Sequence, residues 1–246
     1  PQNTPLAGRV DALRASELPV ALGNGADEWS PDLQLPHSMW EMFGSMDDVA
    51  GDALALAFAQ KHCAAGGDGW RWLWVQDARS TRSSGRPFLH GLPPPLRSGF
   101  IHVEAGGAAD ALWAMEEGVR CGELSFVIGE IVGDPKVLDF TAIRRLVLAA
   151  ERNGVMLYLL RREGFANLSA ARLRWRVTAA PSALHRWNSM APGVPRVRAE
   201  LFRGRGLRPG QFWLEHGVGS HEPDHSLLVV PDLRDRPVEP DYRATG

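Results

Sequence analysis

The chain has 246 residues, of which 44% are hydrophobic and 23% are charged, and its formal net charge is −2. These values are typical of a globular protein with one good core, and the near-neutral charge argues against a global basic surface for nucleic acid. No apolar run approaches the roughly 20 residues of a membrane-spanning helix, and no basic-then-apolar leader opens the sequence, so we expect a cytoplasmic protein without membrane contact.

Composition divides the chain into three parts. Residues 1–34 are predicted to be an N-terminal arm with one short helix, Val10 to Leu18, followed by Pro and Gly breaks. Residues 35–230 carry the periodic apolar segments and are predicted to form one domain. Residues 231–246 are polar and interrupted by Pro, and we expect them to be disordered.

The first two thirds of the domain alternates strands and helices. The expected order is strand Met39–Phe43, helix Ala50–Ala65, strand Trp70–Gln76, a long loop Asp77–Arg97, strand Phe100–Glu104, helix Ala108–Arg120, strand Leu124–Gly129, helix Asp139–Arg152 and strand Val155–Leu160. The two later helices have apolar residues at helical spacing. The last two strands are continuously apolar, which is typical of a parallel sheet covered on both faces.

After Leu160 the long helices stop. Four strand candidates follow at Leu173–Ala180, Arg196–Phe202, Gln211–His216 and Ser226–Val230. Because no helix separates them, we expect an antiparallel C-terminal extension of the sheet.

The turn after the first strand has the place of a phosphate-binding loop but lacks its chemistry. Such a loop needs glycines, a Lys and a Ser or Thr in the pattern G-x-x-x-x-G-K-[ST]. Gly44 begins the turn, but the Lys position falls on Ala50 or on Asp52, which flank Gly51. Asp47 and Asp48 add negative charge where phosphates would lie, so we predict a degenerate loop without a nucleotide cofactor.

The order of elements resembles the RecA core, and several segments resemble the ImuA family, the RecA-like accessory proteins of a bacterial mutagenesis cassette. The RecA likeness lies in the first turn, in the strand Ser125–Glu130 and in the late hairpin Arg196–Gly217. The ImuA likeness covers roughly residues 35–230. Its blocks are Trp74–Asp77, His90–Leu92, Ala114–Gly118, Val127–Glu130, Arg144–Glu151 and Ala170–Val177.

This resemblance implies an α/β fold with a RecA-like core and a role in SOS-induced error-prone repair. It also implies three partners: an ImuB-like protein related to the Y-family polymerases but inactive, a specialised error-prone replicative-type polymerase reached indirectly, and RecA itself. We therefore expect a non-catalytic assembly factor for translesion DNA synthesis that acts through the terminal segments Gln2–Leu22 and Arg203–Tyr242.

Candidate contacts with DNA or with a partner are arginines that follow the strand Val155–Leu160, an arginine in the expected strand Leu173–Ala180, and arginines in a Gly-rich turn. They are Arg161, Arg162, Arg174, Arg203, Arg205 and Arg208. Solvated strand-edge charges are the alternative explanation for the first three. A few arginines support only weak, salt-sensitive DNA binding.

Other chemistries have weaker support. Asp77 and Glu130 follow strands where an ATPase would need acids, but we interpret them as caps of the sheet ends. The His-rich segment from His216 to His225 matches no standard zinc spacing, so we expect no metal site, and the Trp strand is interpreted as core rather than as a base-stacking platform. Two alternative functions remain: a RecA-like, ATP-hydrolysing recombination mediator and an SOS cell-division inhibitor of the SulA type.

Overall fold

The computed structural model describes residues 28–63, 69–182, 185, 187–188, 190–216 and 227–230. The expected helix at Val10–Leu18 and the C-terminal tail therefore lie outside the described residues. The elements are β1 (Met39–Gly44), α1 (Ala50–Cys63), β2 (Trp72–Asp77), α2 (Ala78–Ser84), η2 (Leu89–Gly91), α3 (Pro94–Arg97), β3 (Phe100–Ala105), α4 (Ala108–Arg120), β4 (Phe126–Val132), α5 (Phe140–Asn153), β5 (Met156–Arg162), β6 (Leu173–Ala180), β7 (Arg196–Gly204), β8 (Gly210–His216) and β9 (Leu227–Val230).

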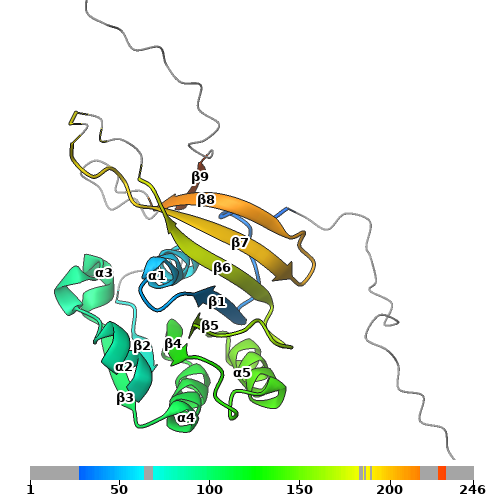
Figure 1. The fold of residues 1–246 in the computed structure, drawn as a ribbon. Coiled ribbons are helices and arrows are strands. Elements are labelled where there is room, and N and C mark those ends of the chain that lie inside the picture. Colours follow the sequence, from blue (N-terminus) through cyan, green and yellow to red (C-terminus); the bar gives the residue numbers. More distant parts are fainter. Residues whose placement is uncertain are drawn as a thin grey trace, which may run out of the picture.

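One nine-stranded sheet, in the order β3-β2-β4-β5-β1-β6-β7-β8-β9, runs through the described residues (Figure 1). The strands β1 to β5 pair in parallel, and β6 pairs in parallel with β1. The strands β7, β8 and β9 continue the sheet in antiparallel fashion. The expected mainly parallel sheet with an antiparallel extension is confirmed, except that β6 itself belongs to the parallel part.

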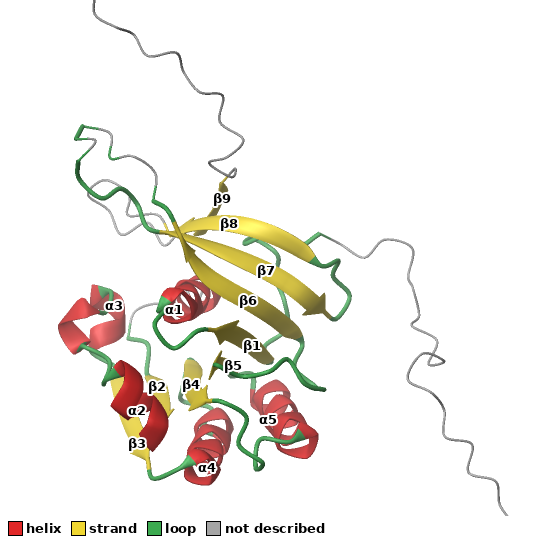
Figure 2. Ribbon diagram, in the orientation of Figure 1, coloured by secondary structure: helices red, strands yellow, loops and turns green. Residues whose placement is uncertain are grey.

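Two apolar layers cover the two faces of the sheet. One layer joins α1 and α3 to Trp40 of β1 and Tyr158 of β5, and the other joins α4 and α5 to Leu157 and Leu159 of β5. Figure 2 shows the helices on the two sides of the parallel strands, with the extension projecting away from them. Alternation along the strands produces this division, because successive side chains point to opposite faces.

The helices α4 and α5 form where the apolar spacing predicts them. All the residues expected on their inner sides are buried, namely Ala111, Leu112, Met115, Val119, Ile143, Leu146, Val147 and Ala150. Asp139 caps α5 by accepting a hydrogen bond from the N–H of Ala142 (2.8 Å), a contact typically worth about 1 kcal/mol. Gly154 ends α5 in the left-handed conformation (φ 65°) that glycine adopts without a steric penalty.

The tryptophans of the second strand form core, as predicted. Trp70, Trp72 and Trp74 are each at most 8% exposed and belong to the layer that includes α1. Trp72 also donates from its indole N–H to the carbonyl of Leu96 (2.7 Å), which fixes α3 against the sheet. Trp29 joins the same core, at 3% exposure, with its ring close to those of Phe58, Trp175 and Phe212. The packed core therefore begins before the boundary at residue 35 that composition suggested.

Two local predictions are wrong. The segment 77–97 is not one long loop, since it contains α2, η2 and α3. The strands β4 and β5 also run further than expected and include Glu130, Arg161 and Arg162. Apolar periodicity missed both features because α2 is polar and because charged side chains extend the two apolar strands.

None of the described helices combines the length and the apolar character required to cross a lipid bilayer.

Candidate functional site

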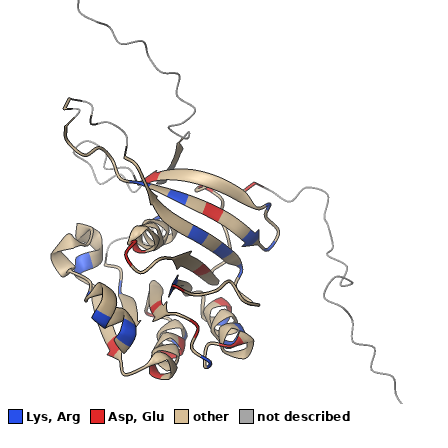
Figure 3. Cartoon of the chain, viewed as in Figure 1, with Lys and Arg blue, Asp and Glu red and all other residues tan. Residues whose placement is uncertain are grey.

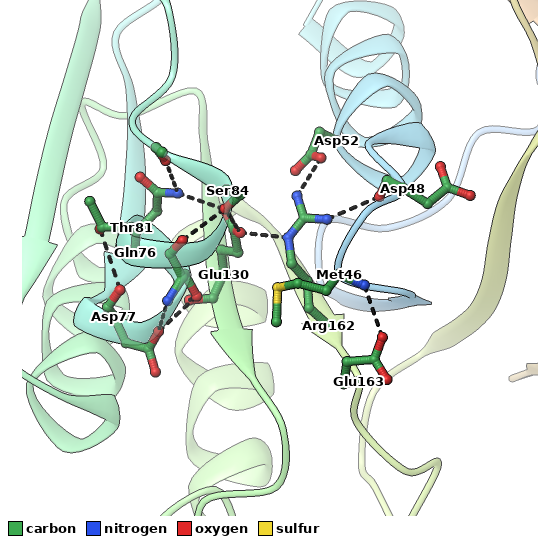
Figure 4. A network of polar contacts seen from close by, with 12 residues as sticks. Met46, Asp48, Asp52, Gln76, Asp77, Thr81, Ser84, Glu130, Arg162 and Glu163 are labelled. Atoms are coloured by element: carbon green, nitrogen blue, oxygen red, sulfur yellow. Dashed lines mark hydrogen bonds and ion pairs between the residues drawn. The ribbon is translucent and has the colours of Figure 1, made fainter.

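The β1–α1 loop, residues 45–49, is held by carboxylates of the protein itself. The N–H of Met46 donates to Oε1 of Glu163 (2.9 Å) (Figure 4). The N–H of Ala50 donates to Oδ1 of Asp48 (2.8 Å). Asp47 accepts a hydrogen bond from the hydroxyl of Ser45 (2.8 Å), which lowers the pKa of Asp47. Negative groups of the chain thus already occupy two of the N–H donors at this turn.

A buried arginine approaches the same loop from β5. The guanidinium of Arg162 donates to the carbonyl of Asp48 (3.0 Å) and lies 3.5 Å from that of Ser45. It also forms ion pairs with Asp52 at the start of α1 and with Glu130 on β4, each at 2.5 Å. Arg162 is only 5% exposed, so these contacts replace the water it loses on burial.

Glu130 connects this arginine to β2 and α2. Its Oε2 accepts from the amide of Gln76 (2.9 Å), and its Oε1 accepts from the hydroxyl of Ser84 (2.8 Å). Gln76 in turn contacts Nε2 of His102 on β3 (2.8 Å). The network therefore crosses four strands, and both oxygens of the Glu130 carboxylate are satisfied. Figure 4 shows these side chains converging on Arg162 and Glu130.

The charges of this cluster do not balance. One guanidinium faces two carboxylates, and burial together with the nearby Glu130 raises the pKa of Asp52 to about 6, although Arg162 acts in the opposite direction. The two carboxylates raise the pKa of Arg162 above its usual value and keep it protonated. The raised pKa of Asp52 shows that its negative charge is under-compensated in the folded state.

A cleft of about 390 Å³ opens over this cluster, between the start of α1 and the segment that follows α2. Its floor includes Asp52, Glu130 and Arg162, and its walls include Leu56 and Trp74. Oδ1 of Asp52 and the indole Nε1 of Trp74 are buried, and neither has a hydrogen-bond partner among the described residues.

A second buried charge cluster lies on the opposite face of the sheet. Glu41, which is 0% exposed, accepts from Arg174 (2.6 Å) and lies 3.3 Å from Arg161. Arg161 also pairs with Asp134 (2.5 Å) in the β4–α5 loop, and Arg174 stacks on the ring of Phe43 at 5.2 Å. Here two guanidinium groups face two carboxylates, so the formal charges balance.

The predicted arginine contacts divide into two groups. Arg161, Arg162 and Arg174 are at most 5% exposed and paired inside the sheet, so the expectation that they are exposed, solvated charges is wrong. Arg203, Arg205 and Arg208 lie exposed around the β7–β8 turn, and their role as contacts stays a prediction. Figure 3 shows other basic residues on β6 and on the neighbouring strand β7 of the antiparallel extension.

The two acids considered for catalysis have structural partners. Asp77 caps α2 by accepting from the N–H (2.8 Å) and the hydroxyl (2.7 Å) of Ser80. Glu130 lies inside β4 and does not follow it. Gln76, Ser84 and His102 were not predicted to belong to a site. Gln76 and His102 lie beside apolar residues of strands β2 and β3, whereas Ser84 ends the polar helix α2, where the sequence gives no such signal.

No metal-binding group of three His, Cys, Asp or Glu residues occurs within the described part of the chain. Most of the His-rich segment, from residue 217 to residue 225, lies outside that part.

Comparison with known proteins supports the sequence resemblance. No family model matches the chain. It is 32% identical over 162 residues to Protein ImuA of Caulobacter vibrioides, in strains NA1000 / CB15N and ATCC 19089 / CIP 103742 / CB 15. The alignment covers 62% of this chain and 64% of each relative, so it spans slightly less than two thirds of the relatives' own length. The chain is therefore a distant homologue of proteins named ImuA.

Proposed function

We propose that this chain is a non-catalytic accessory factor of SOS-induced, error-prone translesion DNA synthesis, built on a RecA-like core whose nucleotide site is degenerate. The similarity to ImuA supports the biological setting. The parallel strand order and the position of the β1–α1 loop support the RecA-like core.

One observation carries the non-catalytic part of the proposal: charged side chains of the protein already bind N–H and carbonyl groups of the β1–α1 loop. A phosphate-binding loop directs free N–H groups and a Lys at its ligand. Here the N–H of Met46 is bonded to Glu163, and the guanidinium of Arg162 is bonded to carbonyls of the loop and to two acids. A triphosphate at this place would meet the carboxylates of Glu163, Asp47 and Asp48, and the arginine that lies there, Arg162, is already paired with two acids. Phosphoryl transfer depends almost entirely on positioning and charge, so this arrangement disfavours ATP hydrolysis.

Since ATP hydrolysis is disfavoured, we propose that the chain acts by binding partner proteins. We propose an ImuB-like protein as the direct partner, with RecA as a further one, and the exposed turn that bears Arg203, Arg205 and Arg208 as part of the contact surface. The same turn supports only weak, salt-sensitive DNA binding.

Titration with ATP and Mg²⁺ tests the non-catalytic part. We expect no saturable binding and no thermal shift for the full chain. A saturable shift accompanied by phosphate release would support the ATP-hydrolysing mediator instead.

Damage-induced mutation frequency tests the biological part. Deletion of the gene is expected to reduce the frequency to the level of a strain without the cassette. Replacement of Arg203, Arg205 and Arg208 by Ala should reduce it while the protein level stays constant, and should weaken capture of the ImuB-like partner. The matched control replaces three exposed arginines elsewhere, Arg82, Arg144 and Arg152, and should leave both readouts unchanged. An unchanged mutation frequency on deletion, together with a division arrest on overproduction, would indicate the SulA-type function.

A further inference from the structure

Two residues that line the cleft above Arg162 each have a buried polar atom without a hydrogen-bond partner among the described residues. Oδ1 of Asp52 is a hydrogen-bond acceptor, and the indole Nε1 of Trp74, whose side chain is 5% exposed, is a donor. Both residues line the cleft. Buried polar groups almost always have a partner, and one without a partner calls for an explanation. A ligand that supplied one donor and one acceptor would satisfy both atoms.

The charges around the cleft indicate that the hydrogen-bond donor of the ligand is positively charged. Asp52 and Glu130 share the single guanidinium of Arg162, while Arg86 at the rim is already paired with Glu104 (2.6 Å). Each oxygen of Glu130 has partners, whereas only one oxygen of Asp52 does. The cleft therefore has an unmet requirement for one positive charge next to Asp52, which is consistent with the raised pKa of that carboxyl.

The walls of the cleft specify the shape of the ligand. Leu56, Trp74 and Leu92 offer apolar surface below the rim, and the rim carries Val49 and Phe88, which are 66% and 72% exposed. The guanidinium of an arginine is planar and stacks on aromatic rings, and the aliphatic part of the same side chain packs on apolar surfaces. A compact ammonium group would use these surfaces less well. Exposed apolar residues around a polar floor are also typical of protein-binding surfaces, where arginine is a frequent anchor.

We propose that this cleft receives an arginine side chain presented by a partner polypeptide. Its guanidinium donates to Oδ1 of Asp52, its stem lies between Leu56 and Phe88, and a backbone carbonyl of the same segment accepts from the indole of Trp74. This inference deepens the proposed function, because it depends on the cleft being free of nucleotide and serving recognition.

The first test uses the full chain with ¹⁵N-labelled tryptophan and the probe N-acetyl-arginine methylamide, which carries both the guanidinium and the amide carbonyls. We expect a saturable shift of one indole signal at concentrations below about 10 mM. The matched probe, N-acetyl-citrulline methylamide, has nearly the same shape without the charge and should bind at least about tenfold more weakly, the loss expected from one charge-assisted hydrogen bond.

Variants locate the binding. Asp52→Asn should reduce the affinity for the arginine probe about tenfold or more, and Phe88→Ala, at an exposed position that the fold does not need, should reduce it severalfold. Asp47→Asn, in the β1–α1 loop that precedes the helix of Asp52, removes an equal charge outside the cleft and should leave the affinity unchanged.

Equal binding of the two probes, absence of a saturable shift, or full affinity in both Asp52→Asn and Phe88→Ala would each overturn the inference. The probe comparison on the unaltered chain decides the matter even if a variant does not fold. Failure of the arginine probe while ATP also does not bind would refute this inference alone, whereas ATP binding would refute the proposed function.

Discussion

Two consecutive residues of β5, Arg161 and Arg162, lie on opposite faces of the sheet and have opposite electrostatic surroundings. Arg161 pairs with Glu41 and Asp134, and Arg174 pairs with the same Glu41, so two cations face two acids. Arg162 faces Asp52 and Glu130 alone, so one cation faces two acids. Rings of Phe43 and Phe202 pack against the arginines of the first cluster, which borders a cavity of about 320 Å³. The second cluster lies beside the cleft of about 390 Å³.

If the cleft receives a partner side chain as proposed, the same strand contributes to stability on one face and to recognition on the other. In a balanced buried cluster the positive and negative charges already neutralise one another, so the cluster does not attract a further charged group. An unbalanced cluster beside a cleft attracts a ligand of the missing sign. The two clusters should also respond differently to substitution, because arginine stays protonated in proteins whereas a carboxylate can take up a proton.

The largest effect is expected from Glu41→Gln. It leaves Arg161 and Arg174 buried with only the carboxylate of Asp134, and neither guanidinium can lose its proton. We expect a loss of about 3 to 5 kcal/mol in the free energy of unfolding, nearly independent of pH. Urea denaturation between pH 5 and pH 8 measures it. Glu200→Gln, which breaks the exposed pair with Arg176, is the control and should cost less than about 1 kcal/mol. A small loss for Glu41→Gln would mean that the balanced cluster does not hold the sheet together.

Arg162→Met breaks the other cluster and should cost about 3 to 4 kcal/mol at pH 8, because it leaves two buried carboxylates unpaired. Asp52 can then be neutralised by a proton, and its pKa should rise further above the unfolded value. The stabilising protonated form is complete at low pH and is lost as the pH rises, so the loss should shrink toward pH 5. Urea denaturation of Arg162→Met at pH 5 and at pH 8 checks this. An equal loss of stability at the two pH values would contradict the expected difference from Glu41→Gln, whose loss is nearly independent of pH.

Asp52→Asn isolates the raised pKa. Between about pH 4 and pH 6 the folded protein binds more protons at Asp52 than the unfolded chain does, so this group makes the wild type less stable as the pH rises. Relative to the variant, the wild type should lose at most about 3 kcal/mol over this interval.

The measurement is the difference in the free energy of unfolding between wild type and Asp52→Asn at each pH, because His62 has the opposite effect on the pH dependence of stability. Burial lowers the pKa of His62 to about 4, so its contribution to stability increases as the pH rises from 4 to 6.5. This contribution cancels in the comparison of wild type and Asp52→Asn. A flat difference would show that the pKa of Asp52 is ordinary.

The smallest effect is expected from Phe202→Leu. The ring lies 5.2 Å from the guanidinium carbon of Arg174 and 4.3 Å from that of Arg176. Loss of these cation–π contacts should cost about 1 kcal/mol or less, because leucine retains most of the apolar area. Chemical denaturation detects it, and a cost similar to that of Glu41→Gln would assign the stability of the balanced cluster to the aromatic rings rather than to its charges.

The regular elements could be predicted from the sequence because their signals are local. The bounds of α4, Ala108–Arg120, and the buried residues of α5 follow directly from apolar spacing. The continuous apolar segments of β4 and β5 indicate strands buried on both faces, and the structure places both in the interior of the parallel sheet.

The candidate site could not be predicted in the same way. Arg161, Arg162 and Arg174 looked like exposed charges, because in a sequence an arginine at a strand end is far from the acids that bury it. Arg162 and Asp52 are separated by 110 residues, and Arg174 and Glu41 by 133. The polar helix α2, which supplies Ser84 to Glu130, has no apolar stripe to reveal it.

The sequence by itself determined the alternation of strands and helices, the absence of a lysine from the β1–α1 loop, and the arrangement of the core residues, because these depend on neighbours a few positions apart. Only the tertiary structure decided which charges are buried together, which face of the sheet has an excess of acid, and where a cleft lies above it. These properties depend on strands and loops brought side by side from distant parts of the chain, and a buried charge is stabilised only by the partners that it meets there.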